Sequence, residues 1–161
     1  MNESSFDVVG IGNAIVDVLT TIDDSVLDRL SFNKGSMTLI DENKAKELYE
    51  MTPKRIQRSG GSVANSLACV AQLGGKAAFI GRVRDDNLGE VFTEEIKRTG
   101  TIFNTPPSSV GPSTARCLIF VTPDAQRTMC TYLGASVLLE PKDIDLSEVS
   151  KAKILYLEGY L

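Results

Sequence analysis

Short apolar segments alternate with segments of helical periodicity along much of this chain, and glycine ends several of them. Residues 6–12 are a short apolar run that predicts a buried strand and 77–83 predict another strand, whereas 62–73 and 88–98 carry helical patterns. A last apolar strand is expected at 154–158. Strands that alternate with helices are typical of a mostly parallel sheet with helices packed against it. The sequence therefore predicts an α/β fold, in which a Rossmann-like, mostly parallel sheet is the middle of three layers.

Two stretches depart from this alternation. Residues 16–40 hold strand-like segments in succession, and 115–133 has the pattern of a β-hairpin that turns at 123–126. Because strands follow strands here, we expect a small separate sheet that projects from the main one. Residues 141–149 are expected to be helical. The main sheet is expected to be unfinished at its last strand, as in one half of a larger unit.

The composition excludes several classes of site. The 161 residues carry a net charge of −4 with Lys and Arg spread along the chain, so we expect no nucleic-acid surface. Without His there is no Cys/His zinc site and no Ser-His-Asp triad, and we expect no metal site. Cys69, Cys117 and Cys130 form no CxxC pair and are expected to be buried in a reducing compartment. We see no secretory signal and no apolar run near the ~20 residues of a membrane span, so a cytoplasmic protein without a membrane partner is expected.

The end of the first predicted strand carries Gly10, Gly12, Asn13 and Asp17. Ligands of open α/β sheets bind beyond the carboxyl ends of the strands, where an Asp can accept two hydroxyl hydrogen bonds from a polyol. A glycine turn with a solvated Asp is the alternative. A dinucleotide fingerprint needs a third glycine, and Ile15 stands at that position.

A second glycine motif precedes the helix at 62–73. Gly60 and Gly61 allow a ligand to approach the backbone closely, and the helix N-terminus offers free N–H groups. Asn65 lies in the first turn and can reach the same place. An ordinary strand-to-helix turn is the alternative.

A third motif, GRVRDDNLG at residues 81–89, contains two consecutive Asp residues before a helix. Asp at a helix N-terminus accepts hydrogen bonds from free N–H groups. We therefore expect this motif to act as a helix cap.

Together and in this order, these motifs resemble the ribokinase-like (PfkB) carbohydrate kinases. The resemblance covers essentially the whole chain, including the hairpin ARCLIFVTPDAQRTMCTYLGA and the closing YLEGYL, although Val63, Leu67 and Arg84 depart from the common pattern. Ser62 after the double glycine and the opening GNAIVD, with Ile15 placed to touch a base, resemble adenosine-kinase-type members. The resemblance implies a nucleoside substrate, adenosine favoured, with a fructose- or ribose-like sugar as the alternative.

The resemblance also implies the residues of a substrate site. Those expected to contact the nucleoside or sugar are Asn13, Ile15, Asp17, Gly60, Gly61, Ser62, Asn65, Cys130, Leu133 and Glu158. Arg127, on the hairpin, is expected to approach the phosphates, with a solvated turn charge as the alternative. For Glu158, a solvated carboxylate at the end of the strand is likewise the alternative. The strand-rich stretches at about 16–40 and 115–133 would form a lid over this site.

The implied activity is ATP-dependent phosphorylation of a hydroxymethyl group, with ATP and Mg²⁺ as cofactor. Residues 1–161 would be the N-terminal part of the kinase domain. The ATP-binding half and the catalytic Asp are expected beyond Leu161, so we expect no catalytic residue in this chain and no activity from it alone. The faces of an exposed lid need covering, which favours a homodimer. A non-catalytic ligand-binding or dimerisation module and, more distantly, a dinucleotide oxidoreductase are the alternatives from other classes.

Overall fold

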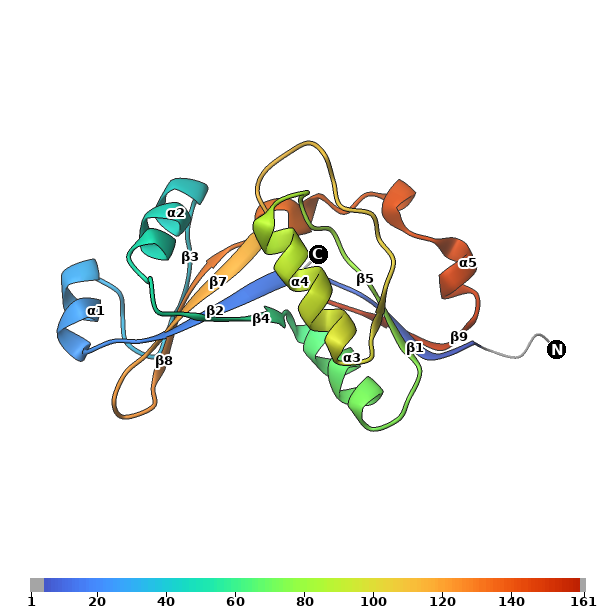
Figure 1. Cartoon of the computed structure of the whole chain (residues 1–161), viewed down its shortest axis with the longest axis horizontal. Coiled ribbons are helices and arrows are strands. Elements are labelled where there is room, and N and C mark those ends of the chain that lie inside the picture. The colour runs from blue at the N-terminus through green and yellow to red at the C-terminus, as the bar shows by residue number, and fades with distance from the viewer. Residues whose placement is uncertain (1–4, 160–161) are drawn as a thin grey trace.

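The computed structural model describes residues 5–159, which form two β-sheets with helices packed against each. Sheet A is a parallel sheet of four strands in the order β6-β5-β1-β9. Sheet B is a mixed sheet of five strands in the order β3-β8-β7-β2-β4, and it projects from the body of the molecule (Figure 1). A second, projecting sheet was predicted from the succession of strands at 16–40 and 115–133.

The strands and helices have the following bounds. Sheet A contains β1 (Phe6–Ile11), β5 (Ala77–Ile80), β6 (Ile102–Phe103) and β9 (Ala152–Leu157). Sheet B contains β2 (Ile15–Thr21), β3 (Met37–Leu39), β4 (Ile56–Gly60), β7 (Ala115–Val121) and β8 (Arg127–Tyr132). The helices are α1 (Asp24–Leu30), α2 (Glu42–Glu50), α3 (Ser62–Gln72), α4 (Asn87–Arg98), η1 (Gly134–Leu138), η2 (Pro141–Asp143) and α5 (Leu146–Val149).

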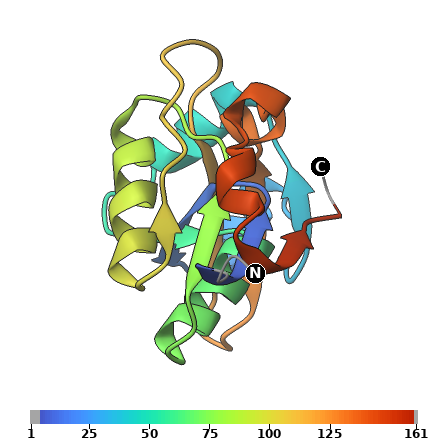
Figure 2. The same ribbon diagram turned by 90° about the vertical axis from the view of Figure 1, so that its right-hand side faces the viewer.

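Sheet A is the middle of three layers, as the alternating pattern predicted. Helices α3 and α4 cover one face, where Phe79, Phe92 and Phe103 form an aromatic cluster with ring centroids 5.3–5.8 Å apart. On the other face, Val9 and neighbouring side chains pack against Ile144 and its segment. Figure 2 shows α4 on one side of the sheet and the η2–α5 segment on the other. Burial on both faces explains why β1 and β5 read as apolar runs, whereas the apolar side chains of β9, from Ile154 to Leu157, are exposed.

Sheet B has one covered face and one open face. Helices α1 and α2 cover the side chains of Leu118, Phe120 and Cys130, which are buried. Successive side chains of a strand point to opposite faces, so Cys117 and Ile119 point to the other face. No helix of the described residues packs on that face in the way that α1 and α2 pack on the first.

Several elements differ from the sequence prediction. The expected helix at 141–149 is two short pieces, because the chain is extended between them and the Asp145 carboxylate caps a new helix at Ser147. Strand β5 ends at Ile80 rather than Val83, and η1 was not predicted. β4 lies outside the stretches predicted for the projecting sheet, yet its antiparallel pairing with β2 places it in sheet B.

The cysteines divide into two groups. Cys117 and Cys130 are buried as expected, but the expectation was wrong for Cys69, which is exposed on α3. The apolar stripe of α3 is formed by Val63, Ala64 and Leu67, and Cys69 lies outside it. Within residues 5–159, no helix is long and apolar enough to cross a membrane.

Candidate functional site

The carboxyl ends of β1 and β9 form the point where the strand order of sheet A reverses. The chain runs outward from β1 through β5 to β6, and then returns to the other side of β1 at β9. Ligands of open α/β sheets bind in the crevice at such a point. Two predicted site residues, Asn13 and Glu158, follow β1 and β9 and therefore meet here.

Glu158 and Asn13 are joined by a hydrogen bond. The backbone N–H of Asn13 donates to Glu158 Oε2 at 2.9 Å, and the Glu158 N–H donates to the Ile11 carbonyl at 3.1 Å. A side chain at Gly12 would overlap the Glu158 carboxylate. Glycine at position 12 therefore leaves space for this contact. Glu158 has a structural hydrogen bond and is not simply a solvated carboxylate at a strand end.

The Asn13 side chain carries an unused acceptor. Asn13 is only 2% exposed, and within the described residues its Oδ1 atom has no hydrogen-bond partner. A buried oxygen without a donor costs about 1–3 kcal/mol. This atom is therefore an acceptor that a ligand hydroxyl or amine could satisfy.

Asp17 lies on the open face of sheet B. The strand register places it in a cross-strand row with side chains that share its face: Arg58, Asp17, Cys117, Thr131 and Leu39, on β4, β2, β7, β8 and β3 respectively. Val16 and Val18, on either side of Asp17 in sequence, are buried in the core with α4. The same strand thus presents a carboxylate to one face and apolar side chains to the other.

The double glycine brings Asp17 and Asn13 to one place. A side chain at Gly60 would overlap the Asp17 carboxylate, and one at Gly61 would overlap the Asn13 carbonyl oxygen. Gly61 also has φ +103°, a backbone conformation that favours glycine. Residues 60 and 61 are therefore glycine because the backbone passes directly against both partners.

Asp17 and Cys117 have raised pKa values. Burial raises the pKa of Asp17 to about 6, and the positive charge of Arg127 opposes this shift. Burial likewise raises the pKa of the Cys117 thiol to about 12, while its Sγ accepts a hydrogen bond from Thr131 Oγ1 at 3.3 Å. At neutral pH the row therefore contains one carboxylate and an uncharged thiol, a pattern suited to hydroxyl-bearing ligands.

The other predicted residues of β2 and α3 lie next to Asp17 and the double glycine, whereas Cys130 does not. Ile15 shares the face of Asp17 and pairs with Gly60, while Ser62 and Asn65 are exposed in the first turn of α3. Cys130 lies on the opposite face, fully buried beneath α1 and α2, because it pairs with Leu118 rather than Cys117. The structure therefore does not bring Cys130 to the other site residues.

Leu133 and Arg127 lie at opposite ends of β8. Leu133 follows the strand and borders a mostly apolar cavity of about 430 Å³, together with Leu39, Val137 and Leu138. Arg127 is exposed at the far end of β8, although its charge acts on Asp17.

Leu39, Cys117, Thr131 and the two η1 side chains were not predicted as site residues. The alternation along β3 and the hairpin gives two possible faces, and only the cross-strand register shows which one contains Asp17.

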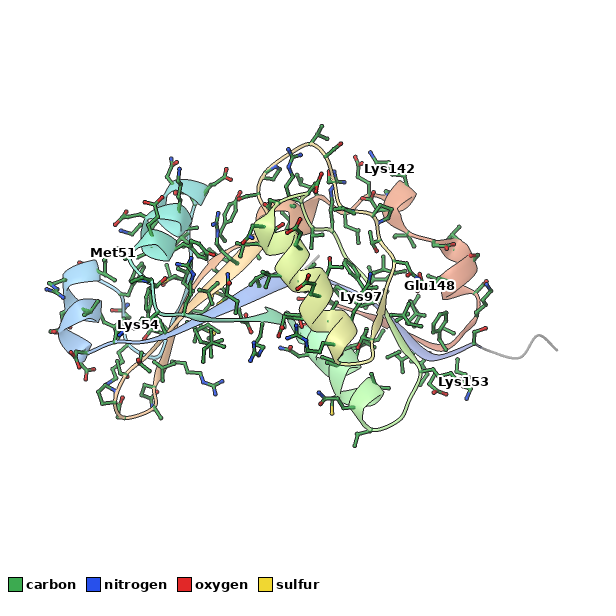
Figure 3. All side chains as sticks on the ribbon, in the orientation of Figure 1. Met51, Lys54, Lys97, Lys142, Glu148 and Lys153 are labelled. Atoms are coloured by element: carbon green, nitrogen blue, oxygen red, sulfur yellow. The ribbon has the colours of Figure 1, made fainter. Side chains whose placement is uncertain are left out.

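Two larger cavities lie elsewhere, on either side of the loop at 104–107. Lys142 and Glu148 border one of about 550 Å³, and Lys97 borders the other of about 680 Å³ (Figure 3). Neither includes Asp17, Asn13 or Glu158.

Comparison with known proteins identifies the family. Residues 35–161 match the model of the pfkB family carbohydrate kinases. The chain belongs to this family. It is therefore a pfkB family kinase chain, as the resemblance of its motifs implied.

Solved structures of similar fold come from nucleoside and sugar kinases. An adenosine kinase from Sinorhizobium meliloti superposes with a TM-score of 0.87 at 48% identity, over 97% of this chain and 48% of that chain. A probable sugar kinase from Rhizobium etli CFN 42 gives a TM-score of 0.89 at 46% identity, over 98% of this chain and 48% of that one.

Among curated relatives, a fructokinase from Solanum tuberosum is 29% identical over 106 residues, which is 65% of this chain and 33% of the relative. The pfkB family chain thus spans about half the length of the two solved kinases and about a third of this fructokinase.

Proposed function

We propose that the protein that contains this chain is an ATP-dependent kinase that phosphorylates a hydroxymethyl group of a nucleoside, with adenosine favoured. The observation that supports this substrate is the cross-strand row of sheet B, which has Asp17 near one end and the apolar cavity beside Leu39 at the other. Adjacent strands are about 4.8 Å apart, so roughly 14 Å separates the two backbone positions. A carboxylate at one end suits a ribose, and an apolar cavity at the other suits a base.

The ribose would lie against the glycine turn. Asp17 would accept hydrogen bonds from two ribose hydroxyls, and the free N–H groups at the start of α3 would approach the same sugar. Asn13 Oδ1, which is buried and has no partner within residues 5–159, would accept a further hydrogen bond. Ile15 would contact the base or sugar from the same face.

Sheet B would act as a lid over this site. Its open face carries the row that we assign to the substrate, and closure of such a face excludes water from phosphoryl transfer. Catalysis in this reaction class comes mostly from positioning and electrostatics. Arg127, at the far end of β8, would approach the phosphates on closure.

The phosphoryl donor that the family implies is ATP with Mg²⁺. Within residues 5–159, no group of three or more His, Cys, Asp and Glu side chains could hold a metal ion, and no residue of this chain is assigned to the donor. We therefore derive no catalytic step from this chain. We propose that the donor site and the catalytic base belong to the part of the family's length that this chain does not span.

An activity panel tests the substrate. The full-length protein would be assayed for ATP-dependent phosphorylation of adenosine, ribose and fructose, with thermal shifts recorded for each. We expect adenosine to give the highest kcat/KM. Phosphorylation of fructose without adenosine would favour the sugar-kinase alternative, to which the similarity to fructokinases points. Binding without any phosphorylation would favour the non-catalytic module.

We also propose that a second copy of the protein covers the outer part of the sheet B face. Leu19, Ile56 and Val121 border an open, apolar cavity of about 470 Å³ there, and Ile56 is 58% exposed (Lys54, beside it, is labelled in Figure 3). Analytical ultracentrifugation would show a dimer that Ile56→Lys dissociates and that Leu73→Lys, at the exposed end of α3, does not. A monomer at all concentrations would contradict this assignment.

A further inference from the structure

The Asp86 carboxylate does more than cap a helix. Its Oδ1 atom accepts a hydrogen bond from the Gly89 N–H at 2.8 Å, which is the cap that the sequence predicted. The same carboxylate also accepts two hydrogen bonds from Thr114, one from the hydroxyl at 2.7 Å and one from the backbone N–H at 2.9 Å. Asp86 therefore joins the N-terminus of α4 to a residue 28 positions away.

Thr114 lies at the root of sheet B. It is fully buried and immediately precedes β7, whose first residue, Ala115, pairs with Ile15. Ile15 in turn pairs with Gly60, the last residue of β4. The three strands that leave the body for sheet B, β2, β4 and β7 (Figure 1), are thus in register at the residue that follows Thr114.

The turn that holds Asp86 is tightly packed. The Arg84 N–H donates to Thr114 Oγ1 at 3.0 Å, and the Arg84 carbonyl accepts from the Asp86 N–H. A side chain at Gly89 would overlap the Arg84 carbonyl oxygen and would lie 3.2 Å from Thr114 Oγ1. The hydroxyl of Thr114 is therefore hydrogen-bonded to both Asp86 and Arg84, and close packing at Gly89 restricts its movement.

Helix α4 makes this contact rigid with respect to the body. Phe92 and Ile96 on α4 are fully buried in the core that also contains Phe79 of sheet A. The position of Thr114 relative to sheet A is therefore fixed by a packed helix and not by a loop.

Only two residues separate Thr114 from the substrate row. Cys117, on the same strand, is the cross-strand neighbour of Asp17. A shift of the first residues of β7 would therefore move Asp17 relative to Gly60 and Asn13. A displacement of about 1 Å in a positioned group can cost about a hundredfold in rate.

We propose that Asp86 is a positioning residue that anchors the root of sheet B to the body through Thr114, and thereby sets the place of Asp17 in the substrate site. This inference rests on the proposed function, because it assigns Asp17 to the acceptor substrate. Asp86 itself contacts no substrate.

Four variants of the full-length protein test the anchor. Asp86→Asn keeps a good N-cap but replaces one carboxylate oxygen by an NH₂ group, which cannot accept from Thr114. Thr114→Val removes the hydroxyl at equal size, and Thr114→Ser restores it. Asp145→Asn is the matched control, since Asp145 also caps a helix, at Ser147, without any contact to sheet B.

We expect the KM for the acceptor to rise about tenfold in Asp86→Asn and in Thr114→Val, with the KM for ATP unchanged. Thr114→Ser should restore the wild-type KM. The double variant should be at least as impaired as the weaker single one, because Asp86→Asn removes the bond from the Thr114 N–H and Thr114→Val removes the bond from its hydroxyl. The acceptor used is whichever one the wild-type protein phosphorylates best.

Hydrogen exchange supplies a readout that needs no activity. Asp86→Asn should speed exchange of the backbone amides at 115–117 and 15–17 at least about fivefold over Asp145→Asn. Equal exchange and equal KM in these two variants would overturn the anchor. A wild-type protein that phosphorylates no acceptor would overturn the proposed function instead, and the exchange result would still decide the anchor.

Discussion

The backbone N–H of Asn13 donates a hydrogen bond to the carboxylate of Glu158, 145 residues away. This contact joins the ends of β1 and β9 at the point where the strand order of sheet A reverses. It also fixes the backbone of the residue whose side-chain oxygen is buried and unpaired within residues 5–159. The position of Asn13 therefore depends on a carboxylate that directly follows the last strand.

Removal of the Glu158 carboxylate should weaken both folding and acceptor binding. Glu158→Ala leaves the buried Asn13 N–H without an acceptor, which should lower the free energy of unfolding by about 1–3 kcal/mol. Urea unfolding and the acceptor KM would measure the two effects. Glu158→Gln keeps an acceptor oxygen and should lose less than half as much stability; equal losses would show that the hydrogen bond is not the cause.

Asp17 should make the protein less stable as pH rises. Its folded-state pKa is raised to about 6 from 3.8, so between these values the folded state holds more protons than the unfolded state. Stability should therefore fall as pH rises from 4 to 6, by up to about 3 kcal/mol. Asp17→Asn should remove this loss and be more stable than wild type at pH 7, measured by urea unfolding at several pH values. A wild-type minus variant difference that does not depend on pH would contradict the shift.

Acceptor binding should have the opposite dependence on pH. The ionised Asp17 carboxylate is the stronger acceptor for ribose hydroxyls, and with a pKa of about 6 only about a tenth of it is ionised at pH 5. The Kd for the nucleoside should therefore rise about tenfold between pH 8 and pH 5. Titration calorimetry would measure this change, and Asp17→Asn should bind weakly and without the pH dependence.

Gly60 should tolerate no side chain. In Gly60→Ala the new methyl group would overlap the Asp17 carboxylate, so we expect the acceptor Kd to rise by at least about tenfold. Gly74→Ala is the matched control: Gly74 has φ +91°, but no atom of the described part of the chain lies within 4 Å of an added Cβ. That variant should lose about 1 kcal/mol of stability from backbone strain and keep normal binding. Equal Kd values for the two variants would remove Gly60 from the site.

The apolar cavity should select nucleosides over simple sugars. Leu39 borders it, whereas Met37, two residues earlier on the same strand face, does not. Leu39→Ala should raise the KM for adenosine about tenfold because apolar contact with the base is lost, and should leave ribose or fructose kinetics unchanged. Met37→Ala should change neither. An equal effect of Leu39→Ala on all acceptors would place the base elsewhere.

The body of the fold could be predicted from the sequence because its signals are local. Apolar runs marked β1, β5 and β9, and Gly74 with φ +91° follows α3 as a left-handed helix end. The carboxylate of Asp86 caps α4, as its position before the helix predicted.

The face of each sheet B residue could not be predicted in the same way. Cys130 and Thr131 are adjacent in sequence, and only the pairing of Cys117 with Thr131 determines which of them shares the face of Asp17. The place of β4 in sheet B and the contact of Asp86 with Thr114 also depend on residues far apart in sequence. The hydrophobic periodicity of a sequence determines neither the register of paired strands nor which distant residues come into contact.

The parallel pairing of β2 with β7, which begins at Ile15 and Ala115, has a consequence for how the molecule assembles. Partners so distant in the chain lose much entropy when they meet, and such topologies fold slowly. During synthesis β2 leaves the ribosome long before β7. The edge of β2 that pairs with β7 therefore stays unpaired until β7 has been made. An unpaired edge of that kind is prone to aggregate, which predicts that production of this protein benefits from low temperature or from chaperones.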